Sequence, residues 1–310
     1  MNTQVIFDMP FEEYLAIEAL SSSAIKTINV SISDYIEEKK EDTSTQAKDL
    51  GRAYHKRILE GQSAFCDAYT VKKDKSDFLD TVSDIKSFIK DNGASFDSKC
   101  LKPELCDIAR HLGGDLYIDY LENETREFLS RDQHDRINIF GDYLDKQIGD
   151  FKTEVTVLWN IDGVPCKARF DAVNKQGILD LKTFTNPNKI SLDQLPAKII
   201  ANYRYDIQAV FYCEAYKAAS KVNDLFASDA PSFEFLFIQS QGGYNIMRSI
   251  FEPHSHSLYS ENAYWQKALD DISSAVVEYD GYINGDKKHQ FVTVCDWLED
   301  HHLPSYHFIK

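Results

Sequence analysis

The sequence predicts an α/β or α+β domain in which helices flank a central mixed β-sheet. Three observations support this prediction. The amino-terminal half has the apolar spacing of amphipathic helices, strand-forming residues take over near residue 153, and a later helix separates those strands from two more. The predicted order is therefore helices, a three-strand meander, a helix, strands and a helix.

The amino-terminal half is predicted to be mostly helical. The serines of SSSAIKTINV and of SISDYIEEKK can each cap a short helix within residues 10–40. A longer helix is expected over AKDLGRAYHKRILEG, ended by Gly61. Residues 72–150 are rich in charge, and their apolar spacing is typical of helices packed on one face.

The second half carries the predicted sheet. The runs TEVTVLWN, PCKARFDAV and ILDLKTF predict three strands, with IDG and NKQG as the turns between them. After the loop TNPNK, a long helix is expected over YRYDIQAVFYCEAYKAAS. FEFLFIQS and IMRSIFE predict two strands around the turn QGGYN, and a last amphipathic helix is expected over about residues 259–279.

Composition narrows the class of protein. A chain of 310 residues with 43% hydrophobic residues can bury a substantial core, and its net charge of −16 argues against a generic nucleic-acid binder. A basic groove can still be local. No run is long and apolar enough for a membrane span, and the amino terminus does not resemble a signal peptide. Six cysteines without a CxxC pair favour a reduced, cytoplasmic protein.

Two acids and a lysine form the candidate catalytic centre. The second and third strands are joined by a short turn, and alternation places Asp180 and Lys182 on one face, with Asp171 across the hairpin. Buried charges are costly unless they are paired or bind a metal. Asp171 and Asp180, with the backbone carbonyl of Leu181, could hold a hard divalent cation, while Lys182 orients or deprotonates water. The alternative is a structural Asp–Lys salt bridge.

Further residues can join this centre. Gln208 and Tyr212 share a helix face at a spacing of four, and Tyr205 lies on the same side. His55 is a possible metal ligand from an upstream helix, and Glu154 opens the first strand. Each has a plainer alternative: aromatic core for Tyr212, a structural role for His55, and strand-end exposure for Glu154.

The ordered motifs resemble a known family. GRAYH (residues 51–55), FD (170–171), DLKT (180–183) and QAVFY (208–212) resemble the RecB-like PD-(D/E)XK nucleases, and more closely the RecE or exonuclease VIII nuclease domain and its phage relatives. The opening LSSSAIK and SISDYIEE resemble that group's "LSxSxLK…SPxxY" segment. The match leaves out residues 62–150 and the tail. Phe170 and Ile32 replace two prolines of the family pattern.

The resemblance implies a restriction-endonuclease-like core that depends on Mg²⁺ or Mn²⁺. It also implies 5′-to-3′ digestion of linear double-stranded DNA from its ends, which releases mononucleotides and leaves 3′ single strands for recombination. A separate single-strand annealing protein and a ring-shaped homo-oligomer are the implied partners. No iron–sulfur cluster is expected, because the late CxxC that some relatives use is missing.

By matched position, the resemblance assigns roles to individual residues. The metal ligands would be His55, Asp171 and Asp180; Lys182 would be catalytic, with Gln208 and Tyr212 in support. Glu154 matches a glutamate that opens the first core strand. Of the basic residues on or beside the core, Arg169, Lys189 and Arg204 are the candidate contacts to DNA phosphates.

The predicted organisation is a single nuclease domain over residues 1–310. It would comprise a helical part with the histidine motif (1–61), a helical insert (62–150), a catalytic core (151–280) and a tail (281–310). An endonuclease or repair nuclease would use the same residues. A catalytically idle DNA-binding module is a third reading, favoured by the charge of −16, and a metal-free structural protein is a fourth.

Overall fold

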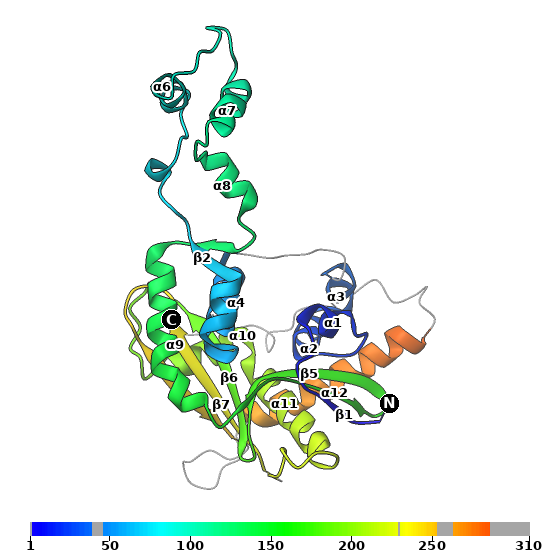
Figure 1. The fold of residues 1–310 in the computed structure, drawn as a ribbon. Coiled ribbons are helices and arrows are strands. Elements are labelled where there is room, and N and C mark those ends of the chain that lie inside the picture. The colour runs from blue at the N-terminus through cyan, green and yellow to red at the C-terminus, as the bar shows by residue number, and fades with distance from the viewer. Residues whose placement is uncertain (1, 39–45, 229, 253–262, 286–310) are drawn as a thin grey trace, which may run out of the picture. The chain divides into compact units, whose positions relative to one another are not determined.

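The computed structural model of the chain describes residues 2–38, 46–228, 230–252 and 263–285 (Figure 1). Contacts within the chain group it into two compact units. We call the first the core unit (Met1–His55 with Lys146–Lys310) and the second the insert unit (Lys56–Asp145). No helix among the described residues is long and apolar enough to cross a membrane.

The core unit contains a six-stranded sheet in the order β1-β4-β5-β6-β7-β8. The strands are β1 (Gln4–Ile6), β4 (Lys152–Ile161), β5 (Val164–Val173), β6 (Gly177–Phe184), β7 (Ser232–Gln239) and β8 (Ile246–Phe251). β6 and β7 are parallel, and the other neighbours are antiparallel. The predicted class, a mixed sheet flanked by helices, is confirmed.

Helices cover this sheet and include the crossover between its parallel strands. They are α1 (Phe11–Ala16), α2 (Ser22–Ile28), α3 (Ile32–Glu38), α4 (Gln46–Leu59), α10 (Leu195–Tyr203), α11 (Tyr205–Ser220) and α12 (Ala263–Asn284). α11 packs on β4 to β7, while α2 and α12 pack on α11 (Figure 1). Since α11 is covered on both sides, it is apolar over most of its surface and lacks the single stripe of a surface helix.

Serine caps begin two of the amino-terminal helices, as their sequences predict. The Ser21 hydroxyl accepts the Ala24 N–H at 3.2 Å, and the Ser31 hydroxyl accepts the Asp34 N–H at 3.3 Å. Just before α2, Leu20 pairs with β5, because its N–H donates to the Pro165 carbonyl at 2.8 Å and its own carbonyl accepts from Lys167. This pairing fixes the start of α2 at the sheet.

The sheet opens between β5 and β6. Only Ala172↔Leu179 and Val173↔Ile178 pair across these two strands, although β5 pairs with β4 along most of its length. Beyond that point Asp171 Oδ2 accepts the Leu181 N–H at 2.7 Å. The Asp171 carboxylate thus replaces the backbone carbonyl that a paired strand would offer. The Leu181 N–H therefore keeps a hydrogen-bond acceptor where the strands separate.

The insert unit has its own small core and a two-stranded sheet. Its elements are α5 (Gly61–Ala68), β2 (Tyr69–Val71), a 3₁₀ turn (Lys75–Asp77), α6 (Val82–Asp91), α7 (Lys102–His111), α8 (Tyr117–Asn123), β3 (Glu127–Leu129) and most of α9 (Arg131–Ile148). Ile85, Ile89, Leu105 and Leu116 are buried together in the core. β2 and β3 are parallel, and the sequence did not predict them.

A buried arginine joins α4 to α9 inside the insert unit. Arg57 is 1% exposed and donates to Asp142, to Asp145 and to the Asn138 side chain. Gly141 permits this arrangement, since a Cβ there would lie 2.4 Å from the guanidinium carbon of Arg57. The glycine is therefore required for close approach in the middle of a helix.

Gly61 ends α4 as predicted, because the last helical residue is Leu59 and Gly61 follows with φ of +91°. Other predicted boundaries are wrong. The loop after TNPNK gives way to α10, which was not predicted, and β1 was also missed. α12 extends to Asn284, into the segment assigned to the tail. Residues 259–262 and 286–310 lie outside the described residues.

Candidate active site

A histidine and two acids meet where β5 and β6 part. One ligand atom from each of His55, Glu154 and Asp171 lies within 4.8 Å of the others. His55 Nδ1 is 3.7 Å from Asp171 Oδ2, and its Nε2 is 3.1 Å from the Leu181 carbonyl oxygen. α4, β4, β5 and β6 therefore each bring one predicted residue to this point, and the Leu181 carbonyl is among them.

Glu154 reaches this group through an unusual backbone conformation. It lies opposite Asp171 in the β4–β5 register, between the pairs Thr153↔Ala172 and Val155↔Phe170, and its φ is +56°. A left-handed conformation costs a residue with a Cβ about 1–2 kcal/mol. Such strain persists where the surroundings hold it in place. Here Arg169 Nε donates to Glu154 Oε2 at 2.5 Å.

Asp180 and Lys182 lie on one face of β6, as the strand alternation predicts. Lys182 Nζ is 2.5 Å from Asp180 Oδ2, and Gln208 Nε2 donates to Asp180 Oδ1 at 2.7 Å. The Asp180 side chain is 1% exposed and that of Lys182 16%. Asp180 does not belong to the group of three; here both its oxygens face Lys182 and Gln208 rather than His55.

Tyr205 and Tyr212, the two predicted site tyrosines of α11, occupy different surroundings. Tyr212 is buried, and its ring meets Phe170 edge-on at a centroid distance of 5.4 Å. Burial is the main cause that raises its pKa. Tyr212 therefore lies within the aromatic core. Tyr205 instead presents its ring to Lys182, whose Nζ lies 5.0 Å from the ring centroid.

Burial raises the pKa values of the Glu154, Asp171 and Asp180 carboxyl groups, so their charged forms are disfavoured without a nearby cation. It raises the pKa of Asp171, and it raises that of Glu154 with the nearby charge of Asp171 adding to the effect. The pKa of Asp180 rises to about 6, mainly through burial, although Lys182 opposes the rise. Clustered, desolvated acids of this kind are the surroundings in which a bound cation stabilises the charged form.

Lys182 and His55 are affected in opposite ways. Burial lowers the pKa of Lys182, but Asp180 and Asp171 outweigh it, so the pKa is raised and the ammonium persists. The idea that burial frees this lysine to deprotonate water is therefore not supported. The pKa of His55 is lowered by burial and then by Lys182. A neutral imidazole is the form that binds metals.

These donors suit a divalent cation. Carboxylate and carbonyl oxygens with one imidazole nitrogen are a set that Mg²⁺ and Mn²⁺ accept. His55, Glu154 and Asp171 would hold the ion, with the Leu181 carbonyl beside them and Asp180 close by. When bound, such an ion neutralises charge on a scissile phosphate and lowers the pKa of a coordinated water.

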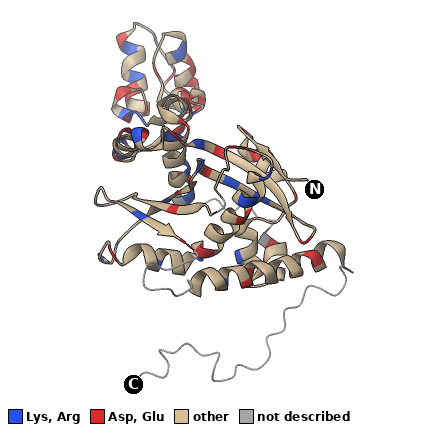
Figure 2. Cartoon of the chain, turned by 90° about the horizontal axis from the view of Figure 1, so that it is seen from below, with Lys and Arg blue, Asp and Glu red and all other residues tan. Residues whose placement is uncertain are grey.

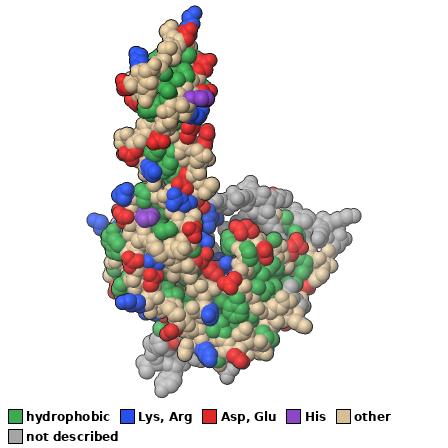
Figure 3. All heavy atoms as spheres, in the orientation of Figure 1, with side chains coloured by type: hydrophobic (Ala, Val, Ile, Leu, Met, Phe, Trp, Pro, Cys, Tyr) green, Lys and Arg blue, Asp and Glu red, His purple; other side chains and the backbone are tan. Residues whose placement is uncertain are grey.

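A cavity of about 710 Å³ opens beside His55, Leu181 and Lys182. Its described lining residues include Lys48, Lys182 and Lys198 but no Asp or Glu. Elsewhere acidic and basic side chains are interspersed, both along the cartoon (Figure 2) and on the face seen in Figure 3. The net charge of −16 therefore coexists with a locally basic cavity at the candidate site.

The three predicted phosphate contacts differ in their surroundings. Arg169 is held by Glu154 and by the Met9 carbonyl at 2.5 Å. Arg204 is paired with Asp206 at 2.9 Å and with Asp271 at 2.5 Å. Lys189 is exposed and lines a neighbouring cavity of about 410 Å³. The arginines are thus committed to carboxylates, and lysines supply the cationic groups at the cavity.

Sequence reasoning missed Lys26. This α2 residue places Nζ 4.7 Å from the Tyr205 ring centroid, on the same ring that Lys182 approaches. Burial, together with the charge of Lys182, lowers its pKa to about 8. The run AIKTI predicted only a helix. The feature that could have indicated Lys26 is the segment LSSSAIK, which contains this lysine and resembles the amino-terminal segment of the family.

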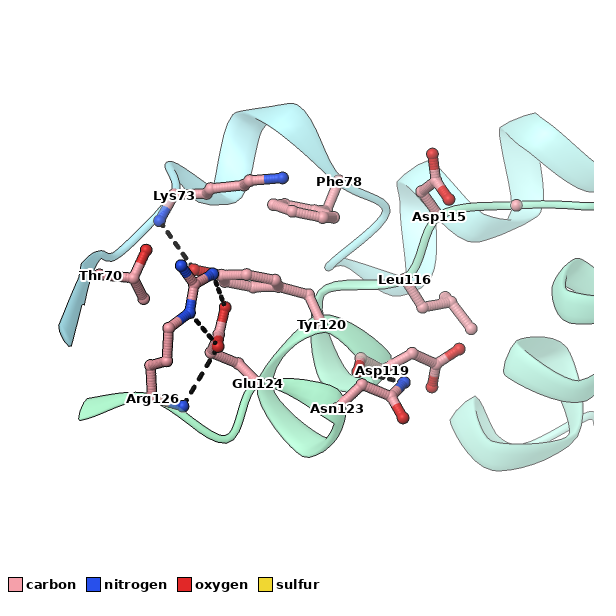
Figure 4. Close-up of a pocket in the computed structure, with 11 residues that line it drawn as sticks. Thr70, Lys73, Phe78, Asp115, Leu116, Asp119, Tyr120, Asn123, Glu124 and Arg126 are labelled. Carbon is pink, nitrogen blue, oxygen red and sulfur yellow. Dashed lines mark hydrogen bonds and ion pairs between the residues drawn. The ribbon is translucent and has the colours of Figure 1, made fainter. Parts of the chain in front are cut away.

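Another cavity, of about 400 Å³, lies within the insert unit (Figure 4). Three of its charged lining residues are held in ion pairs: Arg126 pairs with Glu124 at 2.8 Å, and Asp119 pairs with Arg110, outside the lining, at 2.7 Å. The Tyr120 hydroxyl accepts the Lys73 N–H at 3.2 Å. The group of His55 with two acids, and the half-buried Lys182 beside it, have no counterpart among these lining residues, so the candidate site is the one in the core unit.

The fold and the site define an α/β domain of the PD-(D/E)XK nuclease type. Residues 21–228 match the family described as "PDDEXK-like domain of unknown function (DUF3799)", and the chain belongs to that family. The family description does not specify the RecE-like subtype that the motifs predict. No curated protein is significantly similar to the chain.

Two solved structures are similar in different degrees. A "Putative exonuclease" from Eubacterium rectale superposes with a TM-score of 0.50 at 14% identity, over 90% of this chain and 88% of that one. At this identity the likeness concerns the fold alone. The structure of SSO0001 gives a TM-score of 0.24 at 13% identity, over 74% of this chain and 87% of that one, which is too weak to define a fold.

Proposed function

We propose that this chain is a metal-dependent deoxyribonuclease. One observation carries the proposal: His55, Glu154 and Asp171 converge, and His55 lines a cavity together with the half-buried Lys182 and two further lysines, Lys48 and Lys198. Ligands for a divalent cation, a fixed ammonium and a basic cavity are the components that phosphodiester hydrolysis requires.

Each residue has a distinct role in this proposal. Glu154 and Asp171 hold the cation with the neutral imidazole of His55. Lys182 remains protonated, so it stabilises the negative charge that develops on the phosphate and orients the attacking water. Gln208 fixes Asp180 by the hydrogen bond of 2.7 Å, and Asp180 in turn fixes the ammonium of Lys182. Tyr212 supports Gln208.

The finer function is proposed from the family resemblance. The enzyme would use Mg²⁺ or Mn²⁺, without an iron–sulfur cluster, to digest linear double-stranded DNA from 5′ to 3′ in the cytoplasm. The 3′ single strands would serve recombination with a separate annealing protein, and a ring-shaped homo-oligomer would keep the enzyme on its substrate. The exonuclease-like neighbour in fold is consistent with end-directed cutting.

The test is an assay on linear duplex DNA labelled at either the 5′ or the 3′ end, with and without Mg²⁺. Closed circular DNA is the substrate control. Asp171→Asn is the inactive variant, and Asp162→Asn is the matched control. Asp162 is exposed in the β4–β5 turn with φ of +50°, a conformation that asparagine also tolerates.

Metal-dependent release of the 5′ label as mononucleotide, with circles intact and only Asp171→Asn inactive, supports the proposal. Cutting of circles would instead make the chain an endonuclease or repair nuclease, which the same residues would serve. Absence of cleavage on every substrate would favour a catalytically idle DNA-binding module, the reading that the net charge of −16 favours.

A further inference from the structure

An exposed aromatic ring lies in the cavity close to Lys182. Tyr203 is 62% exposed, and its ring stacks on Tyr205 with centroids 5.5 Å apart and planes at 23°. Lys182 Nζ in turn lies over the Tyr205 ring, 5.0 Å from its centroid. A line of two rings therefore leads from the candidate catalytic lysine to the open part of the cavity, and both tyrosines line that cavity.

The backbone between the two tyrosines makes this stacking possible. Residues two apart in a continuous helix point in different directions, so their rings do not face each other. Arg204 interrupts the helix with φ of +50°, which ends α10 and begins α11. Its guanidinium is anchored by Asp206 and Asp271. A conformation that is costly for arginine is thus held in place, and it sets the two rings face to face.

The cavity has the chemistry of a nucleotide subsite. Its volume of about 710 Å³ lies within the range of small-molecule sites, roughly 300–1,000 Å³. Lys48 and Lys198 supply positive charge, and the exposed face of Tyr203 supplies a stacking surface. Single-stranded nucleic acids are bound by this combination of cationic groups and aromatic faces. Core packing does not account for a ring that is 62% exposed.

We propose that this cavity binds one unpaired nucleotide next to the cleaved phosphate, with its base stacked on Tyr203 and its phosphates facing Lys198 and Lys48. The inference rests on the proposed nuclease function and deepens it. A base inside a duplex is already stacked between its neighbours, so it is not free to stack on Tyr203. The strand must therefore leave the duplex by at least one nucleotide before it is cut.

The test is equilibrium binding of short fluorescent single-stranded DNA to the full chain, with Ca²⁺ in place of Mg²⁺ and strand integrity checked on a denaturing gel. One oligonucleotide has natural bases, and a set of others has a single abasic position moved along the strand. The variants are Tyr203→Ala, Tyr203→Trp and, as the matched control, Tyr264→Ala. Tyr264 is 59% exposed in the same unit but lines a different cavity.

Wild type and Tyr264→Ala are expected to bind the natural strand about tenfold more tightly than the strand that lacks the stacked base, in line with the effect of losing one stacked base. Tyr203→Ala should lose that difference, and Tyr203→Trp should keep it. Equal weakening of all strands by Tyr203→Ala, or no effect of any abasic position on wild type, would overturn the inference, as would absence of binding.

This outcome is separable from the proposed function. Base-dependent binding through Tyr203 without cleavage in Mg²⁺ would support the subsite and refute the nuclease. Cleavage in Mg²⁺ without base-dependent binding would leave the nuclease standing and refute the subsite.

Discussion

Single side chains at the site carry charges that their surroundings alter, and Lys182 illustrates the effect. The acids around it keep its ammonium protonated, so its contribution is a fixed positive charge rather than a base. Strand alternation alone predicted that Lys182 and Asp180 share a face, and the structure places them 2.5 Å apart. Their protonation could not be predicted, because it depends on burial and on Asp171, which tertiary packing brings near.

We expect Lys182→Ala to lower the rate of cleavage by about 100- to 1,000-fold, the effect of losing one electrostatic stabiliser of a transition state. DNA binding should change only a few-fold. Lys198→Ala should do the reverse, weakening binding with a smaller effect on the single-turnover rate. Single-turnover kinetics and fluorescence anisotropy check this pair. A Lys182→Ala variant that cuts at the wild-type rate would remove Lys182 from the proposed mechanism.

Lys26 gives a prediction for the dependence of stability on pH. Its pKa is lowered from 10.5 to about 8 in the folded chain, so the unfolded chain binds this proton more tightly. This group therefore adds stability as the pH rises from about 8 to 10.5, by roughly 1–3 kcal/mol.

Lys26→Gln should remove that contribution, and urea unfolding across this pH range measures it. Lys221→Gln, at an exposed lysine of the same unit, should keep the wild-type slope. An unchanged slope in Lys26→Gln would mean that Lys26 is solvated in the folded chain.

At the scale of elements, the sequence predicted those helices and strands whose formation depends on residues close together in the chain. The meander of β4, β5 and β6 followed from alternating residues and short turns, and the start of α2 followed from the serine cap. β1 and the pair β2–β3 were missed because each strand has only three residues, too few to show a period. Glu154 was expected at the strand opening, but its left-handed backbone could not be foreseen, since no sequence rule places a glutamate there.

The contact between α4 and α9 gives an element-scale prediction. Gly141→Ala would place a methyl group against the guanidinium of Arg57, which Asp142, Asp145 and Asn138 hold in place. We expect a loss of roughly 1–3 kcal/mol in unfolding free energy, the usual cost of overpacking.

Gly51→Ala is the matched control, because a Cβ at this position would meet Thr183 Oγ1 at an ordinary 3.6 Å. It should stabilise by up to about 1 kcal/mol through helix propensity. Thermal unfolding of both variants checks the contrast. Equal effects of the two substitutions would mean that Arg57 moves aside without cost.

For the whole molecule, the metal should act as a stabilising ligand. An ion that binds only the folded chain adds about 2.7 kcal/mol when its concentration is 100 times its Kd. We therefore expect Mn²⁺ to raise Tm by several degrees and Asp171→Asn to abolish the shift, whereas Asp162→Asn retains it. Differential scanning fluorimetry and calorimetry measure both effects. An Asp171→Asn variant with the full Mn²⁺ response would place the metal elsewhere.

The connection between the parallel strands β6 and β7 has a kinetic consequence. The meander that carries Glu154 and Asp171 closes through short turns, so these two acids can come together early in folding. β7 pairs with β6 only after the segment between residues 184 and 232 has folded back, and loop closure of that length slows assembly. His55 lies in α4, upstream of the meander, and is separated from these acids by a still longer stretch of sequence. We therefore expect the hairpin to present its acids before their partners arrive, and the complete centre to be among the last features to form.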